Sequence, residues 1–396
     1  MDEPGLVVIG SGPAGVAAAE AFRKYEGGAA VTILTADPHP PYARPPLSKE
    51  YLRGQTDDVA LHAPDWFADR EIDVLTSRAV ERIQVADHRV IGGGQHYPYR
   101  ALVLACGAGP DPLPVPGAHR VLQLRSLVDA AALRAAADRA ESAVVIGAGF
   151  IGCEAAASLA LQGVAVTLIA PDTLPQIARL GEEAGRRLVV SLNAAGVHYS
   201  GGVKVTELSE DAVHLDNGDT VGAHLVLAAI GVTPRTDLAV AAGLTLRDGR
   251  IAVGADMATS APDIYAAGDA ASAWNGTAER VVTVEHWQDA TDQGALAGAA
   301  AAGHPGQWDQ VPGFWTSIGD TTLKYHAWGD GYDRSHLVEF SDGFTIWYES
   351  DGAVVGVLTC NADDDYELGE ALIRRRAPVP RGAGDDIAHQ AVSERN

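Results

Sequence analysis

Short apolar runs followed by glycine-rich turns occur twice along the chain and predict two strand–turn–helix–strand units. In the first, the run Leu6–Ile9 precedes an alanine-rich helix to Phe22 and a second run at residues 31–34. In the second, residues 143–146 precede an apolar helix to Leu161 and a run at residues 164–169. Apolar strands that alternate with helices are typical of parallel sheets in α/β proteins.

The first turn has the glycine spacing of a dinucleotide-binding loop. It reads Gly10-Ser11-Gly12-Pro13-Ala14-Gly15. Gly10 suits the tight turn, Gly12 lets the backbone approach a pyrophosphate, and Gly15 allows helix and strand to pack closely. Asp37 follows the next strand, where a carboxylate can accept hydrogen bonds from a ribose diol. We therefore predict a dinucleotide site in preference to a plain turn.

The second turn predicts a second nucleotide. It reads Gly147-Ala148-Gly149-Phe150-Ile151-Gly152. No arginine or lysine occurs between Gly152 and Arg179 to bind a 2′-phosphate, and Asp172 could receive a ribose diol instead. NADH is therefore expected, and NADPH stays possible. Two such loops in one chain suit a flavoprotein that is reduced by a nicotinamide.

The remaining pattern predicts antiparallel structure. Polar turns interrupt short apolar runs in residues 56–105, notably at residues 79–90 and 97–105, and again in residues 211–226, and each stretch predicts a β-meander that returns to a sheet. Four strand-like runs near the C-terminus, at residues 322–328, 336–340, 343–349 and 353–360, predict an antiparallel sheet, followed by a helix at residues 365–376. The polar segment 378–396 is expected to be disordered.

Charge and cysteine content narrow the function. The formal net charge of -23 disfavours binding to nucleic acids or to anionic membranes. The first apolar run follows Met1 closely and no run approaches about 18 residues, so we expect a cytoplasmic protein without a leader or a membrane span. Cys106, Cys153 and Cys360 are too scattered for a disulfide framework or a zinc site. Cys106 is expected to be a packing residue.

A proline-dense loop makes a family resemblance specific. The string Tyr42-Ala43-Arg44-Pro45-Pro46-Leu47-Ser48-Lys49 after the first glycine loop resembles the bacterial FAD-dependent ferredoxin reductases that serve haem monooxygenases and ring-hydroxylating dioxygenases. The family usually has an acid in place of Ala43. The resemblance implies an α/β fold with two Rossmann-like domains of the glutathione-reductase type and a C-terminal α+β domain. The implied FAD-binding domain is residues 1–112 and 240–315, the NAD(P)H-binding domain residues 113–239, and the C-terminal domain residues 316–377.

The resemblance also implies the site residues. Lys49 would lie beside flavin N5, and Glu154 would pair with it across the two domains; the alternative for Glu154 is an exposed helix carboxylate. Asp269 would bind the ribityl chain. Further FAD contacts would come from Arg44, Pro46, Ala105, Cys106, Gly107, Gly268, Glu285, His286 and Trp287, the last three at a helix start aimed at the flavin. Phe150, Ile151 and Gly231 would border the nicotinamide nucleotide.

The expected reaction follows from cysteines that are absent. Disulfide reductases of the superfamily carry a CxxxxC pair after the first dinucleotide strand, and this chain has none. The resemblance therefore implies an FAD-dependent NAD(P)H oxidoreductase in which hydride passes from NADH to FAD, and single electrons then pass to an iron–sulfur ferredoxin serving an oxygenase.

Docking residues and two rival functions stay open. An acidic ferredoxin needs a basic contact, and the candidates are Lys324, Arg334, Arg374, Arg375 and Arg376, although arginines also favour a helix C-terminus. One rival function is reduction of a small acceptor such as a quinone or dioxygen. The other is a redox sensor resembling apoptosis-inducing factor, which the departure of residues 314–320 from the aspartate-rich form of ferredoxin reductases favours. The sequence leaves open monomer or homodimer and the identity of the ferredoxin.

Overall fold

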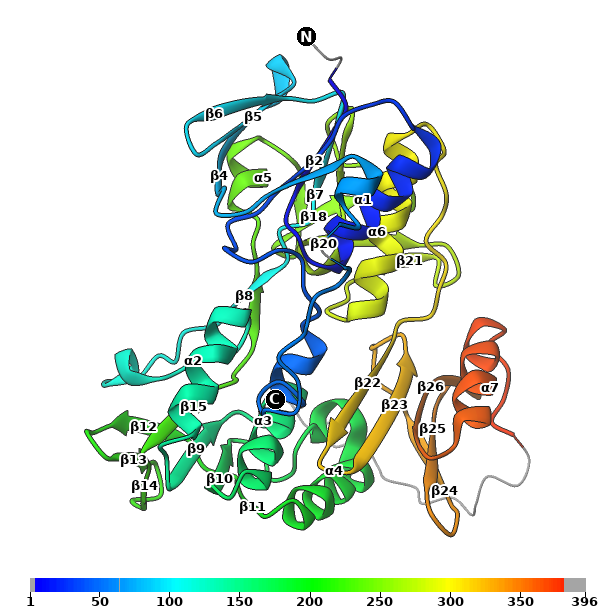
Figure 1. Cartoon of the computed structure of the whole chain (residues 1–396). Coiled ribbons are helices and arrows are strands. Elements are labelled where there is room, and N and C mark those ends of the chain that lie inside the picture. Colours follow the sequence, from blue (N-terminus) through cyan, green and yellow to red (C-terminus); the bar gives the residue numbers. More distant parts are fainter. Residues whose placement is uncertain (1–3, 64, 381–396) are drawn as a thin grey trace. The chain divides into compact units, whose positions relative to one another are not determined.

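The structure is a computed structural model that describes residues 4–63 and 65–380. The described chain divides into two compact units. Figure 1 shows the chain coloured from the N-terminus to the C-terminus. The first unit contains the described residues up to Ala43, together with Asp58–Gly109 and Val232–Pro312. The second unit contains Arg44–Asp57, Pro110–Gly231 and the described residues from Gly313 onward.

The first unit is built on a five-stranded parallel sheet in the order β19-β7-β1-β2-β3. Its strands are β1 (Leu6–Ile9), β2 (Val31–Leu34), β3 (Ile72–Leu75), β7 (Ala101–Leu104) and β19 (Ile264–Ala266). The helices α1 (Pro13–Tyr25) and α6 (Trp287–Ala301) pack side by side against this sheet. Because the strands are parallel, the loops after β1, β2, β7 and β19 meet at one edge.

Smaller antiparallel elements complete the first unit. The predicted meander is present only over residues 80–98, as the sheet β4-β5-β6, because β3 of the same stretch joins the parallel sheet. A mixed sheet has the order β17-β18-β20-β21. The bounds are β4 (Val80–Gln84), β5 (Arg89–Gly92), β6 (Gln95–Pro98), β17 (Leu246–Arg247), β18 (Arg250–Val253), β20 (Ala271–Asn275), β21 (Arg280–Val282) and α5 (Asp237–Ala241). The short strands β8 (Ala108–Pro110) and β16 (Val232–Pro234) pair with each other.

The second unit contains a parallel sheet in the order β11-β10-β9-β15. Its strands are β9 (Ser142–Ile146), β10 (Ala165–Ala170), β11 (Val197–Gly201) and β15 (Leu225–Ala228), and its helices are α2 (Leu127–Ala137), α3 (Phe150–Leu161) and α4 (Ile177–Ala194). The second predicted meander is present as β12 (Val205–Leu208), β13 (Ala212–Leu215) and β14 (Thr220–Gly222). The helix α4 is kinked at Gly181, whose φ is 83°.

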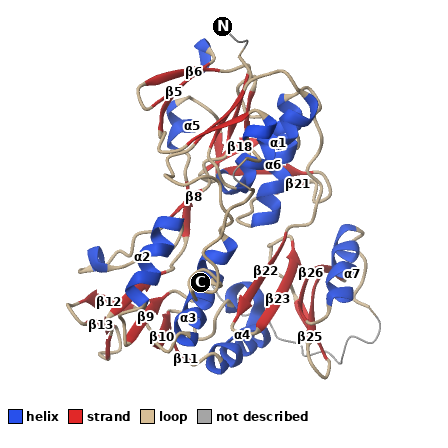
Figure 2. Cartoon of the chain, viewed as in Figure 1, coloured by secondary structure: helices blue, strands red, loops and turns tan. Residues whose placement is uncertain are grey.

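An antiparallel sheet in the order β22-β23-β26-β25-β24 also belongs to the second unit, and Figure 2 shows its strands in red. The bounds are β22 (Gly313–Ile318), β23 (Thr321–Ala327), β24 (Arg334–Glu339), β25 (Phe344–Ser350), β26 (Ala353–Cys360) and α7 (Asp363–Arg374). The four predicted C-terminal strands and their helix are confirmed, and their ends lie within two residues of the predicted positions. The prediction missed β22, because its glycine, aromatic and polar residues do not alternate in hydrophobicity.

The fold class is confirmed, and the boundaries of the two compact units differ from those of the expected domains. Arg44–Asp57, expected in the FAD-binding domain, belongs to the second unit. The described residues expected to form separate NAD(P)H-binding and C-terminal domains share that unit, except for residues 232–239. Arg44–Asp57 contacts this unit through long-range polar bonds, and Leu47 and Leu52 of the segment are buried. Most of the predicted polar tail lies outside the described residues. Within the described ranges, no helix combines the length and the apolar character that a membrane span requires.

Candidate functional site

The first glycine loop, between β1 and α1, leaves no room for a side chain at Gly10 or Gly15. Gly10 has a φ of +111°, and a Cβ there would lie 2.2 Å from the carbonyl oxygen of Ala105. A Cβ on Gly15 would lie 1.9 Å from the carbonyl oxygen of Gly10. Gly12 caps α1 without a side-chain hydrogen bond, and Pro13 and Ala14 begin the helix. The backbone N–H groups of this first turn can therefore bind a phosphate, which fits the FAD pyrophosphate.

The helix α6 fixes the position of this loop, and the sequence analysis missed how. A Cβ on Gly294 would lie 2.1 Å from the carbonyl oxygen of Ala14, and one on Gly298 would lie 2.0 Å from that of Ala18. The two glycines four residues apart form a GxxxG pattern that could have indicated a close helix contact. Next to them, Gln293 is fully buried and accepts a hydrogen bond from Gly268 N at 2.9 Å.

The other predicted FAD contacts of the first unit lie after its parallel strands. Asp37 follows β2, and its carboxylate accepts hydrogen bonds from His39 N at 3.0 Å and Tyr42 Oη at 2.7 Å. Each oxygen keeps a lone pair for a ribose hydroxyl. Ala105, Cys106 and Gly107 follow β7 directly.

Gly268 and Asp269 follow β19 in a 3-10 helix, and Asp269 is buried. Arg250 donates hydrogen bonds to the backbone oxygen of Asp269 and to the Glu285 carboxylate, so it joins two of the predicted contacts. His286 caps α6 and Trp287 is the first residue of the helix, as predicted. These residues stay predicted FAD contacts.

The thiols are not activated. Burial raises the pKa of Cys106 to about 11, against the opposing effect of Arg235. Burial and the neighbouring Glu154 raise the pKa of Cys153 to about 12, and burial also raises the pKa of Cys360. All three cysteines are free.

We expect these thiols to react with the disulfide reagent DTNB far more slowly than free cysteine at pH 8. A raised pKa keeps a thiol protonated until the pH approaches that value, so only about one Cys106 in a thousand is a thiolate at pH 8. The rate should rise as the pH approaches 11. Unfolding in urea is the control, because it should restore rapid reaction of all the thiols. Rapid reaction of the folded protein at pH 8 would contradict the assignment of Cys106 to packing.

The second glycine loop, between β9 and α3, repeats the geometry of the first. Gly147 has a φ of +103°, and a Cβ there would lie 2.3 Å from the carbonyl oxygen of Ala229. A Cβ on Gly152 would lie 2.0 Å from the carbonyl oxygen of Gly147. Gly149 caps α3, again without a side-chain hydrogen bond. Phe150 and Ile151 begin the helix, and Ile151 is 38% exposed. The loop fits the pyrophosphate of a nicotinamide nucleotide.

The loop after β10 holds the residues that would receive the ribose. The side chain of Asp172 is exposed there, and its backbone oxygen accepts a hydrogen bond from Tyr199 Oη at 2.8 Å. Gln176, which the sequence analysis missed, has a φ of +56° and donates from Nε2 to the carbonyl oxygen of Ala148 at 3.2 Å. It thereby ties the ribose loop to the glycine loop. Gly231, after β15, has a φ of +130°.

The predicted ion pair between Lys49 and Glu154 forms. Lys49 Nζ lies 2.9 Å from Glu154 Oε2, and each residue is 6% exposed. Two partners were missed: Ser48 Oγ donates to Oε2 of the same carboxylate, and Thr316 Oγ1 donates to Oε1 at 2.8 Å. The alternative of an exposed carboxylate is excluded. Lys49 and Glu154 both belong to the second compact unit, and the expectation that the pair joins the FAD-binding and NAD(P)H-binding domains stays a prediction.

A polar stripe on α3 holds the segment Arg44–Asp57 in the second unit. Glu154, Ser158 and Gln162 are spaced by four residues, so they share one face of α3 and its C-terminal end. Ser158 Oγ donates to the carbonyl oxygen of Ser48 at 2.7 Å, and Gln162 Nε2 donates to that of Leu52 at 2.8 Å. Together with the ion pair, these bonds anchor the segment Arg44–Asp57, which contains Arg44 and Pro46, to the second unit. Local sequence patterns cannot indicate contacts across a hundred residues.

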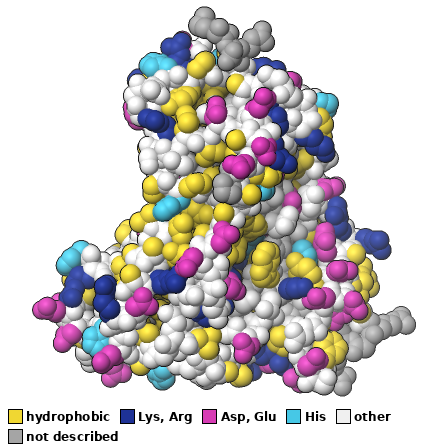
Figure 3. Space-filling view, in the orientation of Figure 1, with side chains coloured by type: hydrophobic (Ala, Val, Ile, Leu, Met, Phe, Trp, Pro, Cys, Tyr) yellow, Lys and Arg dark blue, Asp and Glu magenta, His cyan; other side chains and the backbone are white. Residues whose placement is uncertain are grey.

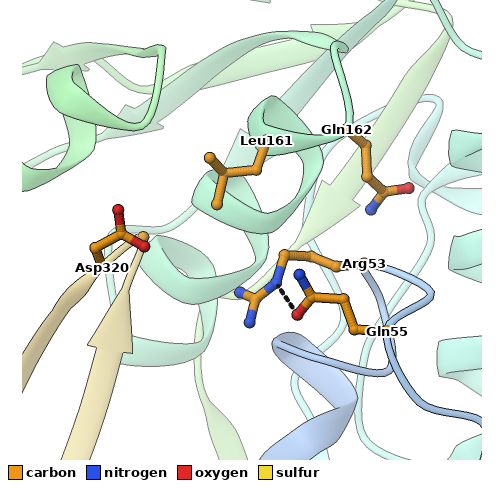
Figure 4. A pocket seen from close by; sticks show the side chains of 6 residues that line it. Arg53, Gln55, Leu161, Gln162 and Asp320 are labelled. Atoms are coloured by element: carbon orange, nitrogen blue, oxygen red, sulfur yellow. Dashed lines mark hydrogen bonds between the residues drawn. The ribbon is translucent and has the colours of Figure 1, made fainter.

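A surface pocket of about 410 Å³ lies at the far end of this stripe. It is lined by Arg53, Gln55, Leu161, Gln162, Gly319 and Asp320. Figure 4 shows Arg53 beside Gln55 and Asp320 on the opposite side. Arg53 donates to Gln55 Oε1 at 3.0 Å and to Ser158 Oγ at 3.3 Å, so its guanidinium already has partners. The pocket is open and holds none of the predicted site residues, and we assign it no role in cofactor binding.

The predicted basic residues do not form one patch. Lys324, on β23, pairs with Asp363 at the start of α7 at 2.7 Å. Arg374, Arg375 and Arg376 lie at the other end of that helix, about 16 Å away along its axis. Arg334 lies at the start of β24. In Figure 3, basic and acidic side chains are interspersed over the visible face. The length of α7 therefore separates Lys324 from the three arginines, and the docking role of these residues stays a prediction.

Known proteins are similar to this chain in sequence and in fold. Residues 4–294 match the model of the pyridine nucleotide-disulphide oxidoreductase family. A ferredoxin–NAD(P)+ reductase of Sphingomonas sp is 32% identical, with 96% of this chain and 95% of the relative covered. Human apoptosis-inducing factor 3 is 31% identical over 98% of this chain and 66% of its own length.

A solved structure agrees with these relatives. The crystal structure of a covalent putidaredoxin reductase–putidaredoxin complex matches with a TM-score of 0.89 and 30% identity, covering 96% of this chain and 95% of that chain. The match extends over both units and includes the C-terminal sheet. This chain therefore belongs to the pyridine nucleotide-disulphide oxidoreductase family, and ferredoxin reductases of that family are similar to it over nearly its whole length.

Proposed function

We propose that this protein carries electrons from NADH through bound FAD to an iron–sulfur ferredoxin that serves an oxygenase. As a ferredoxin reductase of its family, it uses FAD and NAD(P)H. When bound, FAD accepts a hydride and releases electrons one at a time. The preference for NADH and the coupling to an oxygenase are part of the proposal. The expected cytoplasmic location is also kept as a proposal.

The residues divide the work of binding between the two loops. In the first unit, the N–H groups after Gly12 would bind the FAD pyrophosphate, and Asp37 and Asp269 would accept hydrogen bonds from its hydroxyl groups. In the second unit, the N–H groups after Gly149 would bind the nucleotide pyrophosphate. Lys49, held by Glu154, would supply a fixed positive charge to the flavin. These assignments rest on the loop geometry and on the family resemblance.

The choice of acceptor rests on one observation, namely that the three thiols are free and have raised pKa values. A reductase that transfers electrons through cysteine needs a reactive thiolate or a dithiol pair. Here the three cysteines are free, and burial raises the pKa of each. Thiol exchange is therefore disfavoured, and the electrons must pass directly to an external acceptor.

Anaerobic stopped-flow spectroscopy tests this function. The purified flavoprotein is mixed with NADH or NADPH and then with ferredoxins and cytochrome c. We expect rapid flavin bleaching by NADH, and reduction of cytochrome c only when ferredoxin is present. Rapid reoxidation by a quinone or dioxygen without any effect of ferredoxin would replace the proposal by a reductase of small acceptors.

The similarity to human apoptosis-inducing factor 3 favours a redox sensor as the second candidate function. In a sensor, NADH would mainly change conformation or assembly, and turnover would be slow. A reduced flavin that persists with every acceptor in the same experiment would support it.

For the ferredoxin we propose a contact through Arg374, Arg375 and Arg376 at the end of α7. The net charge of -23 repels an acidic partner at long range, so docking needs a local group of positive charge. Both ends of α7 carry paired charges, since Lys324 pairs with Asp363 at 2.7 Å and Arg374 with Glu370 at 3.3 Å, and the three consecutive arginines give the denser group of positive charge.

Replacing Asp172 with alanine should raise the KM for NADH by about tenfold or more. Its exposed carboxylate after β10 would accept hydrogen bonds from the ribose diol, and a hydrogen bond to a charged group contributes about 1.5–3 kcal/mol. The KM for NADPH should change less, because a 2′-phosphate cannot donate such a bond. Steady-state kinetics with both nucleotides measures this change. Glu210→Ala, at another exposed acid of the second unit, is the matched control. Equal KM values for the two variants would remove Asp172 from the ribose site.

A further inference from the structure

We propose that Thr316 is a positioning residue that holds the Glu154 carboxylate in the orientation in which it binds Lys49. The proposal rests on the proposed function in one respect, namely that Lys49 acts on the flavin. Thr316 lies on β22, the strand that the sequence analysis missed, in the motif that departs from the aspartate-rich form of ferredoxin reductases.

The donors to the carboxylate divide unequally between its two oxygens. Oε2 accepts from Lys49 Nζ and from Ser48 Oγ, whereas Thr316 Oγ1 is the sole donor to Oε1 among the described residues. Glu154 is 6% exposed and Thr316 is 1% exposed, so water has little access to replace the Thr316 bond. Without the hydroxyl, Oε1 would lose its donor, and the carboxylate could turn away from Lys49 to find another.

Packing between β22 and α3 sets this contact. Phe314 and Thr316 lie on the same side of β22, because side chains alternate along a strand, and Trp315 between them is 46% exposed. The ring of Phe314 lies 4.6 Å from that of Phe150, one helical turn before Glu154. Two residues of a strand and four residues of a helix span about the same length, roughly 6–7 Å. The aromatic contact therefore places the Thr316 hydroxyl opposite Glu154.

The role of the hydroxyl is separable from the shape of the side chain. Thr316→Val keeps the shape and removes the donor, whereas Thr316→Ser keeps the donor and removes a methyl group. The chain offers a matched control in Thr359 on β26 of the same sheet. Thr359 is 1% exposed, and its hydroxyl has no hydrogen-bond partner among the described residues. Thr359→Val therefore makes the same chemical change in the same sheet without touching Glu154.

Lysine labelling of the FAD-bound protein gives a direct readout. The chain has four lysines, Lys24, Lys49, Lys204 and Lys324, so peptide mapping after treatment with an amine-reactive reagent resolves each one. We expect Lys49 to react about tenfold faster in Thr316→Val, which corresponds to a loss of about 1.4 kcal/mol from the pair. The rates should stay near the wild-type value in Thr316→Ser and Thr359→Val, with Lys204 as the internal reference.

The reduction potential of the bound flavin is the second readout, and it needs no ferredoxin. It should differ from the wild-type value in Thr316→Val, return in Thr316→Ser, and stay unchanged in Thr359→Val. The proposal is overturned if Thr316→Val matches Thr359→Val in lysine labelling, or if Thr316→Ser behaves like Thr316→Val. Glu154→Gln separates the action of the ion pair on the flavin from the role of Thr316. An unchanged potential in Glu154→Gln would remove the proposed action of the pair on the flavin, whereas the labelling still decides the role of Thr316.

Discussion

Replacing Glu154 with alanine should lower the free energy of unfolding by about 3–5 kcal/mol, because it leaves the Lys49 ammonium buried without its partner. Both side chains of the pair are at least nine-tenths buried, and Nζ lies 2.9 Å from Oε2. The change also removes the acceptor of Ser48 and Thr316 and the side chain that begins the polar stripe of α3. Urea unfolding followed by circular dichroism measures the loss.

A second ion pair of the same unit supplies the control for this measurement. Lys324 and Asp363 are 2.7 Å apart, but their side chains are 35% and 68% exposed. Exposed pairs contribute about 0–1 kcal/mol, so Asp363→Ala should change the unfolding free energy by no more than that. The double variant Lys49→Met/Glu154→Leu, which removes both charges, should be more stable than Glu154→Ala. If Glu154→Ala lowered the free energy of unfolding no more than Asp363→Ala, the folded state would not need Glu154 to stabilise the buried charge of Lys49.

Replacing Gly294 with alanine should weaken FAD binding by about tenfold or more, although Gly294 belongs to neither glycine loop. The new Cβ would lie 2.1 Å from the carbonyl oxygen of Ala14, so α6 would have to move away from α1. The first turn of α1 and the start of α6 are both predicted FAD contacts, and the substitution would shift one relative to the other. Titration of the apoprotein with FAD, followed by flavin fluorescence, measures the dissociation constant.

Gly28→Ala is the matched control, because a Cβ at Gly28 has no heavy atom within 4 Å. Its FAD affinity should equal that of the wild type. Gly15→Ala should weaken binding at least as strongly as Gly294→Ala, since its Cβ would lie 1.9 Å from a backbone oxygen of the loop itself. Wild-type affinity in Gly294→Ala would show that the contact between α1 and α6 does not determine the geometry of the FAD site.

The sequence predicts the parts of the site whose physical cause is local. Gly10 and Gly147 have positive φ and stand against backbone oxygens, so the glycine spacing alone identifies both loops. The Lys49–Glu154 pair could be predicted only with the help of the family resemblance. Ser48 and Thr316 could not be predicted, because their hydroxyl groups contact Glu154 across 106 and 162 positions of the chain. The sequence also could not show that Lys324, on β23, lies beside the start of α7, whereas Arg374 lies at its end.

The long separation between Glu154 and Thr316 has a consequence for synthesis of the chain. Thr316 follows Glu154 by 162 residues, which a ribosome adds in about 8–32 s. During that time Lys49, Ser48 and Glu154 have all emerged, but the strand that completes the carboxylate's hydrogen bonds has not. The second unit can therefore close around its buried charges only late in translation. A nascent chain arrested before β22 should expose this polar face to chaperones and proteases.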